Sequence, residues 1–242
     1  MIKVAVAGAT GRMGKLAVEL IEAAQDLTLH AALDSKSELS QMLGANVVLD
    51  VTLPEVSPKV VEYAVANGLK VVVGTSGWSA TKLAVIEKQL EVAANQAGVF
   101  VIPNFSVGSM LATRFAAQAA EFFDSIEIVE AHHAGKIDSP SGTAVRTAEL
   151  IGKARGAKPA PLIPGVGQEA RGQVVAGVPI HSLRLAGVSA KQEVLLGGNS
   201  EVLTISHEAA SVKAYEQGIL LALRKAPEHI GLAVGLDAVI GF

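Results

Sequence analysis

The feature that most restricts the fold is the glycine turn that follows the first apolar run. Residues 2–7 are mostly apolar, as in a buried parallel strand. Gly8, Gly11 and Gly14 come directly after them. A strand, a glycine turn and a helix are the setting of a dinucleotide fingerprint, because the glycines let the backbone approach a pyrophosphate at a helix N-terminus. Thr10 stands where the usual pattern has its second glycine, so the turn alone is a weak indication.

Strands and helices alternate through the rest of the first hundred residues. The expected strands are residues 27–33, 47–51, 69–73 and 99–102. The expected helices are residues 15–24, 58–67 and 79–96. This order predicts a doubly wound parallel sheet of the Rossmann type, whose ligands bind beyond the C-terminal ends of the strands. The turns on that edge are residues 8–14, Asp34, Thr52, residues 74–77 and residues 103–106. Their convergence, rather than any one motif, predicts a nucleotide site.

Asp34 lies twenty residues after Gly14, where an acidic side chain commonly binds the adenosine ribose hydroxyls. A loop aspartate without a role explains its position equally well. Lys36 follows closely, and a cation there could accommodate the 2′-phosphate of NADP. The sequence therefore leaves both NADH and NADPH open as the cofactor.

The second part of the chain has no helix-like stretch between its later strands. The expected helices are residues 111–123, 141–155 and 214–224. The expected strands are residues 125–129, 174–185, 192–196 and 201–206, with an irregular connection at 156–172 and a hairpin turn at 197–200. This pattern predicts a second, α+β domain with an open mixed sheet and the 141–155 helix against it.

We therefore expect two domains. Residues 1–106, completed by 215–242, form the dinucleotide-binding domain, and residues 107–214 form the substrate-binding and oligomerisation domain. The leucines expected on one uncovered sheet face are Leu185, Leu195, Leu196 and Leu203. Self-association is one way to cover such a face.

Residues 130–144 carry the densest set of reactive side chains. They hold two histidines, a lysine, two carboxylates and a Ser-Gly-Thr turn. We expect this stretch between the end of a strand and the start of a helix, where backbone N–H groups and the helix dipole favour anions. Each feature alone has an ordinary structural explanation, but together they indicate an anion site with a proton donor.

Composition narrows the classes of function. The 242 residues carry a formal net charge of −3 and no cysteine, and no apolar run is long enough to span a bilayer. We therefore expect no disulfide framework, no metal site, and no nucleic-acid or membrane partner. The first residues have no signal-peptide layout, so a cytoplasmic protein is expected.

The central stretch resembles the signature of the dihydrodipicolinate reductase family of lysine and diaminopimelate biosynthesis. The motif residues are His132, His133, Lys136, Asp138, Pro140, Ser141, Gly142, Thr143 and Ala144. The glycine turn, Gly74-Thr75 and residues 103–106 occur in the family's order, so the resemblance covers nearly the whole chain. The departures are Val51 where the family often has Phe, Ser76 for Thr, Trp78 for Phe and Ser139 for Ala. Val51 and Trp78 leave the cofactor preference less certain.

The resemblance implies a role for each matched residue. The implied pyrophosphate-binding residues are Gly8, Ala9, Thr10, Gly11, Arg12 and Met13, and Asp34 would bind the ribose. Thr52 is a further implied cofactor-binding residue. The residues implied on the nicotinamide side are Gly74, Thr75, Ser76, Ile102, Pro103, Asn104 and Phe105. The implied catalytic residues are His132 and Lys136. The implied substrate-binding residues are His133, Lys136, Ser141, Gly142 and Thr143.

The implied reaction is NAD(P)H-dependent reduction of 4-hydroxy-tetrahydrodipicolinate, after loss of water, to tetrahydrodipicolinate. Hydride goes to C4 and a His or Lys acid supplies a proton, with His132 and Lys136 both open as its source. The resemblance also implies a homotetramer that binds a small dicarboxylate. Two alternatives are less well supported. A short-chain dehydrogenase needs a Tyr-x-x-x-Lys motif, and neither Tyr63 nor Tyr215 has a lysine four residues later. A protein that only senses a dinucleotide has no need of His132, His133 and Lys136.

Overall fold

The computed structural model describes residues 1–93, 96–156, 158 and 168–241. They form two compact units, one of Met1–Ser106 with Tyr215–Phe242 and one of Val107–Ala214. Most of the irregular connection expected at 156–172 lies outside the described residues, as do residues 94–95 at the end of the expected 79–96 helix.

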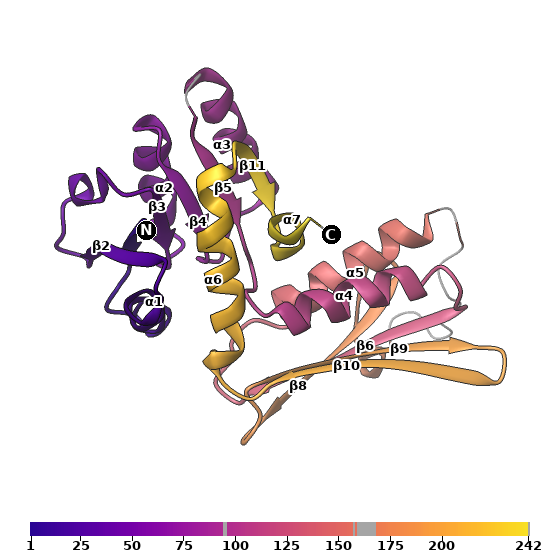
Figure 1. Ribbon diagram of the computed structural model, residues 1–242. Helices are drawn as coiled ribbons and strands as arrows, with labels where there is room; N and C mark the ends of the chain where they lie inside the picture. Colours follow the sequence, from indigo (N-terminus) through magenta and orange to yellow (C-terminus); the bar gives the residue numbers. More distant parts are fainter. Residues whose placement is uncertain (94–95, 157, 159–167, 242) are drawn as a thin grey trace. The chain divides into compact units, whose positions relative to one another are not determined.

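Within the described residues, the first unit holds a six-stranded parallel sheet in the order β11-β5-β4-β3-β1-β2 (Figure 1). Its strands are β1 (Ile2–Ala7), β2 (Leu27–Leu33), β3 (Val47–Asp50), β4 (Lys70–Val73), β5 (Gly98–Val101) and β11 (Gly231–Val234). The chain passes from β1 to β2 on one side and then to β3, β4 and β5 on the other. This doubly wound order confirms the predicted fold class.

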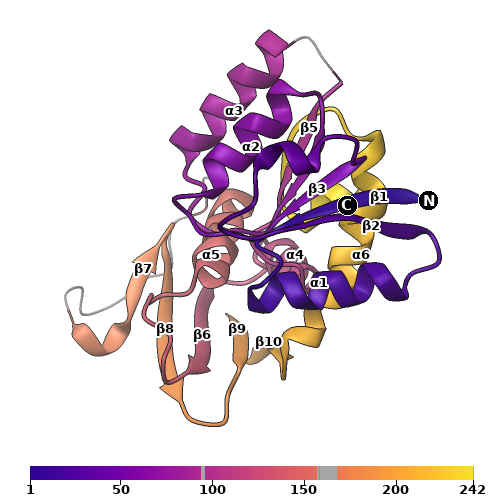
Figure 2. The same ribbon diagram turned by 90° about the vertical axis from the view of Figure 1, so that its left-hand side faces the viewer.

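Helices cover both faces of this sheet. Figure 2 shows α1 (Arg12–Ala23) and α6 (Glu216–Lys225) on one side of the strands and α2 (Ser57–Ala66) and α3 (Ala80–Ala93) on the other. The short helix α7 (Leu236–Ile240) packs on α6. The 3₁₀ turns of the chain are Leu39–Met42, Glu169–Arg171, Val212–Tyr215 and Ala226–Glu228. Every residue of β3 and β5 is buried, which is why these strands appear in the sequence as continuous apolar runs.

Several elements differ from the expectation. Strand β11 was not predicted, because four residues that begin with glycine are too short to carry a periodic signal. The strand expected at 174–185 is a hairpin of β7 (Gln173–Val175) and β8 (Val178–Leu185). Its turn places Ala176 and Gly177 at positive φ, a conformation that alanine rarely adopts. Helix α4 (Val107–Ala119) begins before residue 111, although Gly108 is a poor helix former.

The second unit holds a five-stranded sheet in the order β10-β9-β6-β8-β7, counted over its described residues. The remaining strands are β6 (Ser125–His133), β9 (Ala190–Gly198) and β10 (Glu201–Ala209). Strands β6 and β8 are parallel and the other pairs are antiparallel, so the mixed sheet is confirmed. Helices α4 and α5 (Gly142–Arg155) lie together along one face (Figure 1).

The four leucines expected on one face divide between the two faces. Leu196 is wholly buried toward the helices, and Leu203 pairs with it across the strands. Leu195 and Leu185 point to the opposite, open face. The expectation was wrong because neighbouring residues of one strand, such as Leu195 and Leu196, cannot share a face.

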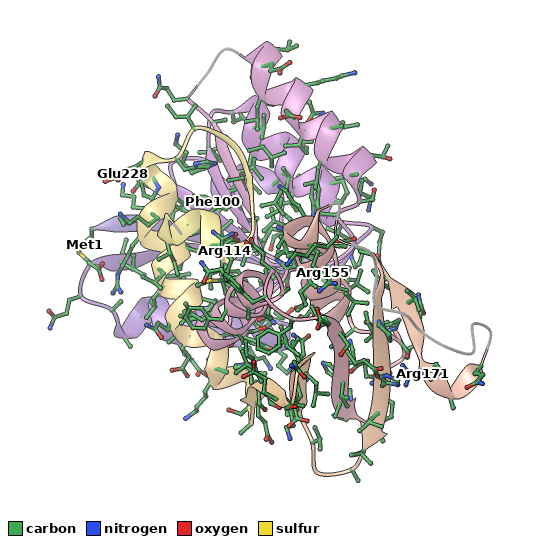
Figure 3. All side chains as sticks on the ribbon, turned by 90° about the vertical axis from the view of Figure 1, so that its right-hand side faces the viewer. Met1, Phe100, Arg114, Arg155, Arg171 and Glu228 are labelled. Atoms are coloured by element: carbon green, nitrogen blue, oxygen red, sulfur yellow. The ribbon has the colours of Figure 1, made fainter. Side chains whose placement is uncertain are left out.

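Two arginines of this unit lie on opposite sides of its sheet, Arg155 on the side of the helices and Arg171 on the open side (Figure 3). Arg155, at the end of α5, is buried and donates to the carbonyls of Ala120 at 3.2 Å and Phe123 at 2.5 Å, so it joins the C-terminal ends of α4 and α5. On the open face Arg171 donates to Glu127 at 2.5 Å, and His181 bonds the other carboxylate oxygen at 2.7 Å.

Candidate active site

The C-terminal ends of five strands meet in register at one edge of the first sheet. Ala7 pairs with Leu33 and Asp50, and Val73 pairs with Asp50 and Val101. Each of these residues is the last of its strand, so the loops that follow begin side by side. The cofactor-binding residues that the resemblance implies all lie in these loops or at the helix start after β1. They are residues 8–13, Asp34, Thr52, residues 74–76 and residues 102–105.

The glycine turn after β1 is closely packed. Gly8 has a φ of +86°, and a Cβ there would lie 2.6 Å from the carbonyl oxygen of Val51. A Cβ at Gly14 would lie 2.1 Å from the carbonyl oxygen of Gly8. Helix α1 begins at Arg12, so Arg12 and Met13 form its first turn, whose N–H groups have no partners within the helix. Two of the glycines are therefore required by space, and the turn presents a helix N-terminus to any anion there.

Asp34 is held by its own turn after β2. Its Oδ1 accepts hydrogen bonds from the Lys36 amide and the Ser37 hydroxyl, both at 2.9 Å. These bonds, the one from Lys36 first, hold the pKa of Asp34 below its ordinary value. The side chain is therefore an ionised, exposed acceptor at the sheet edge, as a ribose-binding carboxylate must be.

Asp50 is a buried carboxylate that the sequence analysis did not single out. It is wholly buried at the end of β3, where its Oδ1 accepts from the Thr52 hydroxyl at 2.6 Å and the Thr75 hydroxyl at 3.3 Å. Its Oδ2 accepts from Ser57 at the start of α2. One carboxylate thus fixes Thr52 and Thr75 in two neighbouring loops. The available signal was an ionisable residue inside an apolar strand.

The loops after β4 and β5 fit closely against each other. A Cβ at Gly74 would lie 2.6 Å from the ring of Phe105, which is itself buried. Asn104 accepts a hydrogen bond from the Ser106 amide at 2.9 Å. The absence of a side chain at Gly74 therefore leaves room for the Phe105 ring, and the loops after β4 and β5 pack directly against each other.

In the second unit, β6 runs to His133 instead of ending at Val129. His132 and His133 are its last residues, so strand alternation turns them to opposite faces. Glu130 and His132 share the face that the helices cover, and His133 is exposed on the other. The structure therefore joins His132 with Glu130 and leaves His133 at the strand end beside Gly135.

Glu130 is wholly buried and binds several partners. Arg184 on β8 donates to both of its oxygens, each at 3.0 Å. His132 Nδ1 lies 2.5 Å from Oε2, and the Ser141 amide donates to Oε1 at 3.2 Å. Burial alone would raise the pKa of Glu130, but the hydrogen bonds from Arg184, Ser182 and His132 together hold that pKa below its ordinary value. Glu130 is therefore an ionised carboxylate inside the protein.

His132 is neutral at neutral pH. Burial is the main cause of its lowered pKa, opposed by Glu130 and reinforced by the charges of Lys136 and Arg184. Because Glu130 is ionised and accepts only, the neutral imidazole must donate from Nδ1, which leaves Nε2 as an acceptor. The Glu130 carboxylate thus sets the tautomer of His132.

The loop after β6 brings Lys136 back toward this cluster. The Lys136 amide donates to the His133 carbonyl at 3.0 Å, and its ammonium donates to Asp138 at 2.7 Å. Arg184 also donates to the carbonyls of Lys136 at 3.3 Å and Asp138 at 2.6 Å. The hydrogen bond from Lys136 is the main cause of the lowered pKa of Asp138. Lys136 is therefore a charged group on a loop that Arg184 holds.

Helix α5 begins beside Glu130. Ser141 caps it, accepting from the Ala144 amide at 3.2 Å. Gly142 is exposed, and a Cβ there would meet nothing within 4 Å. Nothing in the chain itself requires glycine at this position, so open space lies in front of the helix N-terminus. Thr143 follows, and its carbonyl accepts from the Thr147 hydroxyl at 2.9 Å.

Arg184 was not predicted from the sequence, and the two carboxylates of the stretch were expected there without assigned roles. Arg184 lies 54 residues from Glu130, inside a strand with no local motif. In residues 1–93, 96–156, 158 and 168–241, no group of three His, Asp or Glu side chains could hold a metal ion. No helix in these ranges has the length and apolar character needed to cross a membrane.

The lowered pKa of Glu130 predicts how acid affects stability. The unfolded state binds the proton more tightly, so the contribution of Glu130 is fully present above the ordinary pKa of 4.5 and is lost as pH falls through the lower folded value. Glu130→Gln should therefore lower the thermal midpoint at pH 7 and weaken its decline below pH 4.5. The control Glu149→Gln, at an exposed position of α5, should keep the wild-type decline. Equal slopes for all three proteins in thermal scans across pH would contradict the assignment.

Comparison with known proteins agrees with this arrangement. Residues 2–105 match the family model described as "Dihydrodipicolinate reductase, N-terminus", and residues 108–240 match "Dihydrodipicolinate reductase, C-terminus". A 4-hydroxy-tetrahydrodipicolinate reductase of Clavibacter michiganensis is 60% identical over 98% of this chain and 85% of its own length. One from Mycolicibacterium gilvum is 42% identical over 99% of both chains.

Solved structures agree in fold. A dipicolinate-bound dihydrodipicolinate reductase from Paenisporosarcina sp. TG-14 superposes with a TM-score of 0.82 at 30% identity, over 98% of this chain and 99% of the other. A probable dehydrogenase from Thermotoga maritima shares the fold alone, with a TM-score of 0.61 at 11% identity over 98% of this chain and 92% of the other. On both matched regions and these relatives, the chain belongs to the dihydrodipicolinate reductase family, a family of oxidoreductases.

Proposed function

We propose that this protein reduces 4-hydroxy-tetrahydrodipicolinate, by way of dihydrodipicolinate, to tetrahydrodipicolinate in lysine and diaminopimelate biosynthesis. NADH or NADPH is the hydride donor. The observation that carries the proposal is the joining of Glu130, His132 and the Lys136 loop beside an open helix N-terminus, in a chain of this family. The substrate is a dianion, and the Lys136 ammonium and the N–H groups at the start of α5 would face its two carboxylates.

The first unit fits a dinucleotide. The glycine turn is packed too closely for a side chain at Gly8 or Gly14, and α1 begins beside it at Arg12, which supports a pyrophosphate there. The ionised Asp34 on the same edge supports a ribose. Asp50 orders Thr52 and Thr75 in the loops that we assign to the nicotinamide side. When bound, the reduced nicotinamide supplies the hydride, and the chain supplies the shape and charge of the site.

The second unit fits a dicarboxylate. We assign one carboxylate to Lys136 and the other to the start of α5, at Ser141, Gly142 and Thr143. In the structure Lys136 donates to Asp138, which is more than half exposed, so Asp138 holds the ammonium until a substrate carboxylate competes for it. His133 is assigned to substrate on the family resemblance.

Reduction of a conjugated imine also needs a proton at the carbon next to the one that receives hydride. A neutral His132 with Nε2 as acceptor has no proton to give there, whereas the Lys136 ammonium has. We therefore assign the proton to Lys136, with the imidazole of His132 as the acceptor that orients the donor. Burial and, after it, the charge of Lys136 lower the pKa of His132, so the proton donor helps to keep its acceptor neutral.

We also propose that the open face of the second sheet forms the interface of a homotetramer. Leu183 and Leu185 on this face are nearly half exposed, and Val202 is more exposed still. Leu183 and Leu185 lie on one face of β8, and Val202 lies on the same face at the opposite end of the sheet. A second copy of the chain would cover these exposed apolar side chains. Light scattering of the purified protein gives the mass directly, and a monomer would contradict this interface.

Turnover is the first test of the proposed reaction. Dihydrodipicolinate synthase, pyruvate and aspartate semialdehyde would generate the unstable substrate in place, and absorbance would report oxidation of NADH or NADPH. We expect substrate-dependent oxidation that falls about 100-fold or more in Lys136→Met, since general acid catalysis contributes at least that much. It should also fall by about 100-fold in His132→Gln, because the donor loses the acceptor that orients it. A folded protein that binds NADH or NADPH but oxidises neither would be a dinucleotide sensor instead.

Gly142 gives a second test that separates binding from folding. Gly142→Ala should stabilise α5 by up to about 1 kcal/mol, because alanine is the better helix former. It should also raise the KM for substrate, because the new methyl group enters the space assigned to a carboxylate. Gly156→Ala, also in open space but at a positive φ and at the other end of α5, should leave the KM unchanged. An unchanged substrate KM in Gly142→Ala would contradict the assignment of this helix start.

A further inference from the structure

Arg184 has no role in the proposed reaction so far, yet it binds both Glu130 and the loop that carries Lys136. It lies on β8 directly across from His132 on β6 (Figure 2 shows the two strands side by side). Its side chain is four-fifths buried. It donates to both oxygens of Glu130 and to the carbonyls of Lys136, Asp138 and Leu183.

The charge of Arg184 is directed into the protein. Both terminal nitrogens bond Glu130 at 3.0 Å, and Glu130 is wholly buried. Without that guanidinium the carboxylate would be a buried charge held only by neutral donors and a histidine, which is costly. Arg184 is therefore engaged by Glu130, unlike Lys136, whose partner Asp138 is exposed.

The same guanidinium also holds the loop that carries Lys136. Nε donates to the Lys136 carbonyl and Nη2 to the Asp138 carbonyl. A planar fork with five N–H donors can bind a carboxylate and two carbonyls at fixed angles, whereas a lysine ammonium is a point charge on a flexible stem. The position of Lys136 relative to His132 thus depends on the shape of one side chain as well as on its charge.

We propose that Arg184 is the positioning residue of this site. It fixes the His132 ring through Glu130 and the Lys136 loop directly, so that acceptor and proton donor meet a dicarboxylate at a set separation. Arg184 itself does not bind the substrate. The proposal rests on the proposed reduction for its kinetic consequence, but the arrangement of the side chains is independent of it.

Arg184→Lys tests shape at constant charge. Because a small misplacement of catalytic groups can cost about 100-fold, we expect kcat to fall by about that factor, with the KM values for NADH and for substrate changed far less. A direct substrate ligand would behave differently, with a raised substrate KM as the main effect. That result, or a wild-type kcat, would overturn the proposal.

Arg184→Ala tests the guanidinium by replacing it from solution. Millimolar guanidinium chloride should restore part of kcat, and ammonium chloride should not, because only guanidinium fits a bidentate site beside Glu130. The matched control is Arg224→Ala, which removes a similar bidentate pair with Asp26 on the exposed surface of the first unit; neither salt should change its kcat. Folded Arg184→Ala that guanidinium does not rescue would contradict the proposal.

A second readout does not depend on turnover. Glu130, Lys136 and Arg184 are the charged groups that act on His132, and Arg184 lowers its pKa. In an NMR titration the His132 pKa should rise in Arg184→Ala, return toward the wild-type value with guanidinium, and stay near it in Arg184→Lys. An unchanged titration in Arg184→Ala would overturn the proposal. If the wild-type protein oxidises neither NADH nor NADPH, the proposed function is wrong. The titration of His132 would still test whether Arg184 positions the site.

Discussion

The second unit depends on one wholly buried carboxylate, Glu130. Burying a charge is costly unless it is paired and fully hydrogen-bonded. Here the partners come from three elements: Arg184 and Ser182 on β8, His132 on the same strand as Glu130, and the amide of Ser141 at the start of α5. Because one ion holds two strands and a helix together, the residues we assign to catalysis have fixed positions before any ligand arrives.

The first unit uses the same device in a weaker form. Asp50 is also wholly buried at the end of a strand, but its partners are the hydroxyls of Thr52, Thr75 and Ser57 and the amide of Thr52, none of which is charged. Neutral donors satisfy the carboxylate and order the loops after β3 and β4. Glu130, in contrast, has a cation beside it and sets the protonation of a histidine. The difference suits the assigned tasks, since one site holds a cofactor and the other moves a proton.

The sequence predicted those features whose cause is local. Continuous apolar runs became the buried parallel strands, and the Ser-Gly-Thr turn became the start of α5, because both depend on residues near in the chain. The sequence-based prediction was wrong or incomplete where the cause is a residue far along the chain, or where the alternation of side chains along a strand was overlooked. The pairing of Arg184 with Glu130 spans 54 residues, β11 is an edge strand placed by its neighbour β5, and Leu195 and Leu196 were put on one face. The site residues expected from the family resemblance remain predictions for the experiments above.

The claim that most of this account depends on is that Glu130 is ionised inside the folded protein. The carboxyl carbon shift of Glu130, followed by NMR from neutral pH downward in protein labelled at glutamate, measures it directly. The account predicts an ionised carboxylate at neutral pH that takes up its proton only below the ordinary pKa of 4.5. A protonated Glu130 at neutral pH would contradict it, because a neutral carboxyl group would neither pair with Arg184 as an ion nor fix the tautomer of His132.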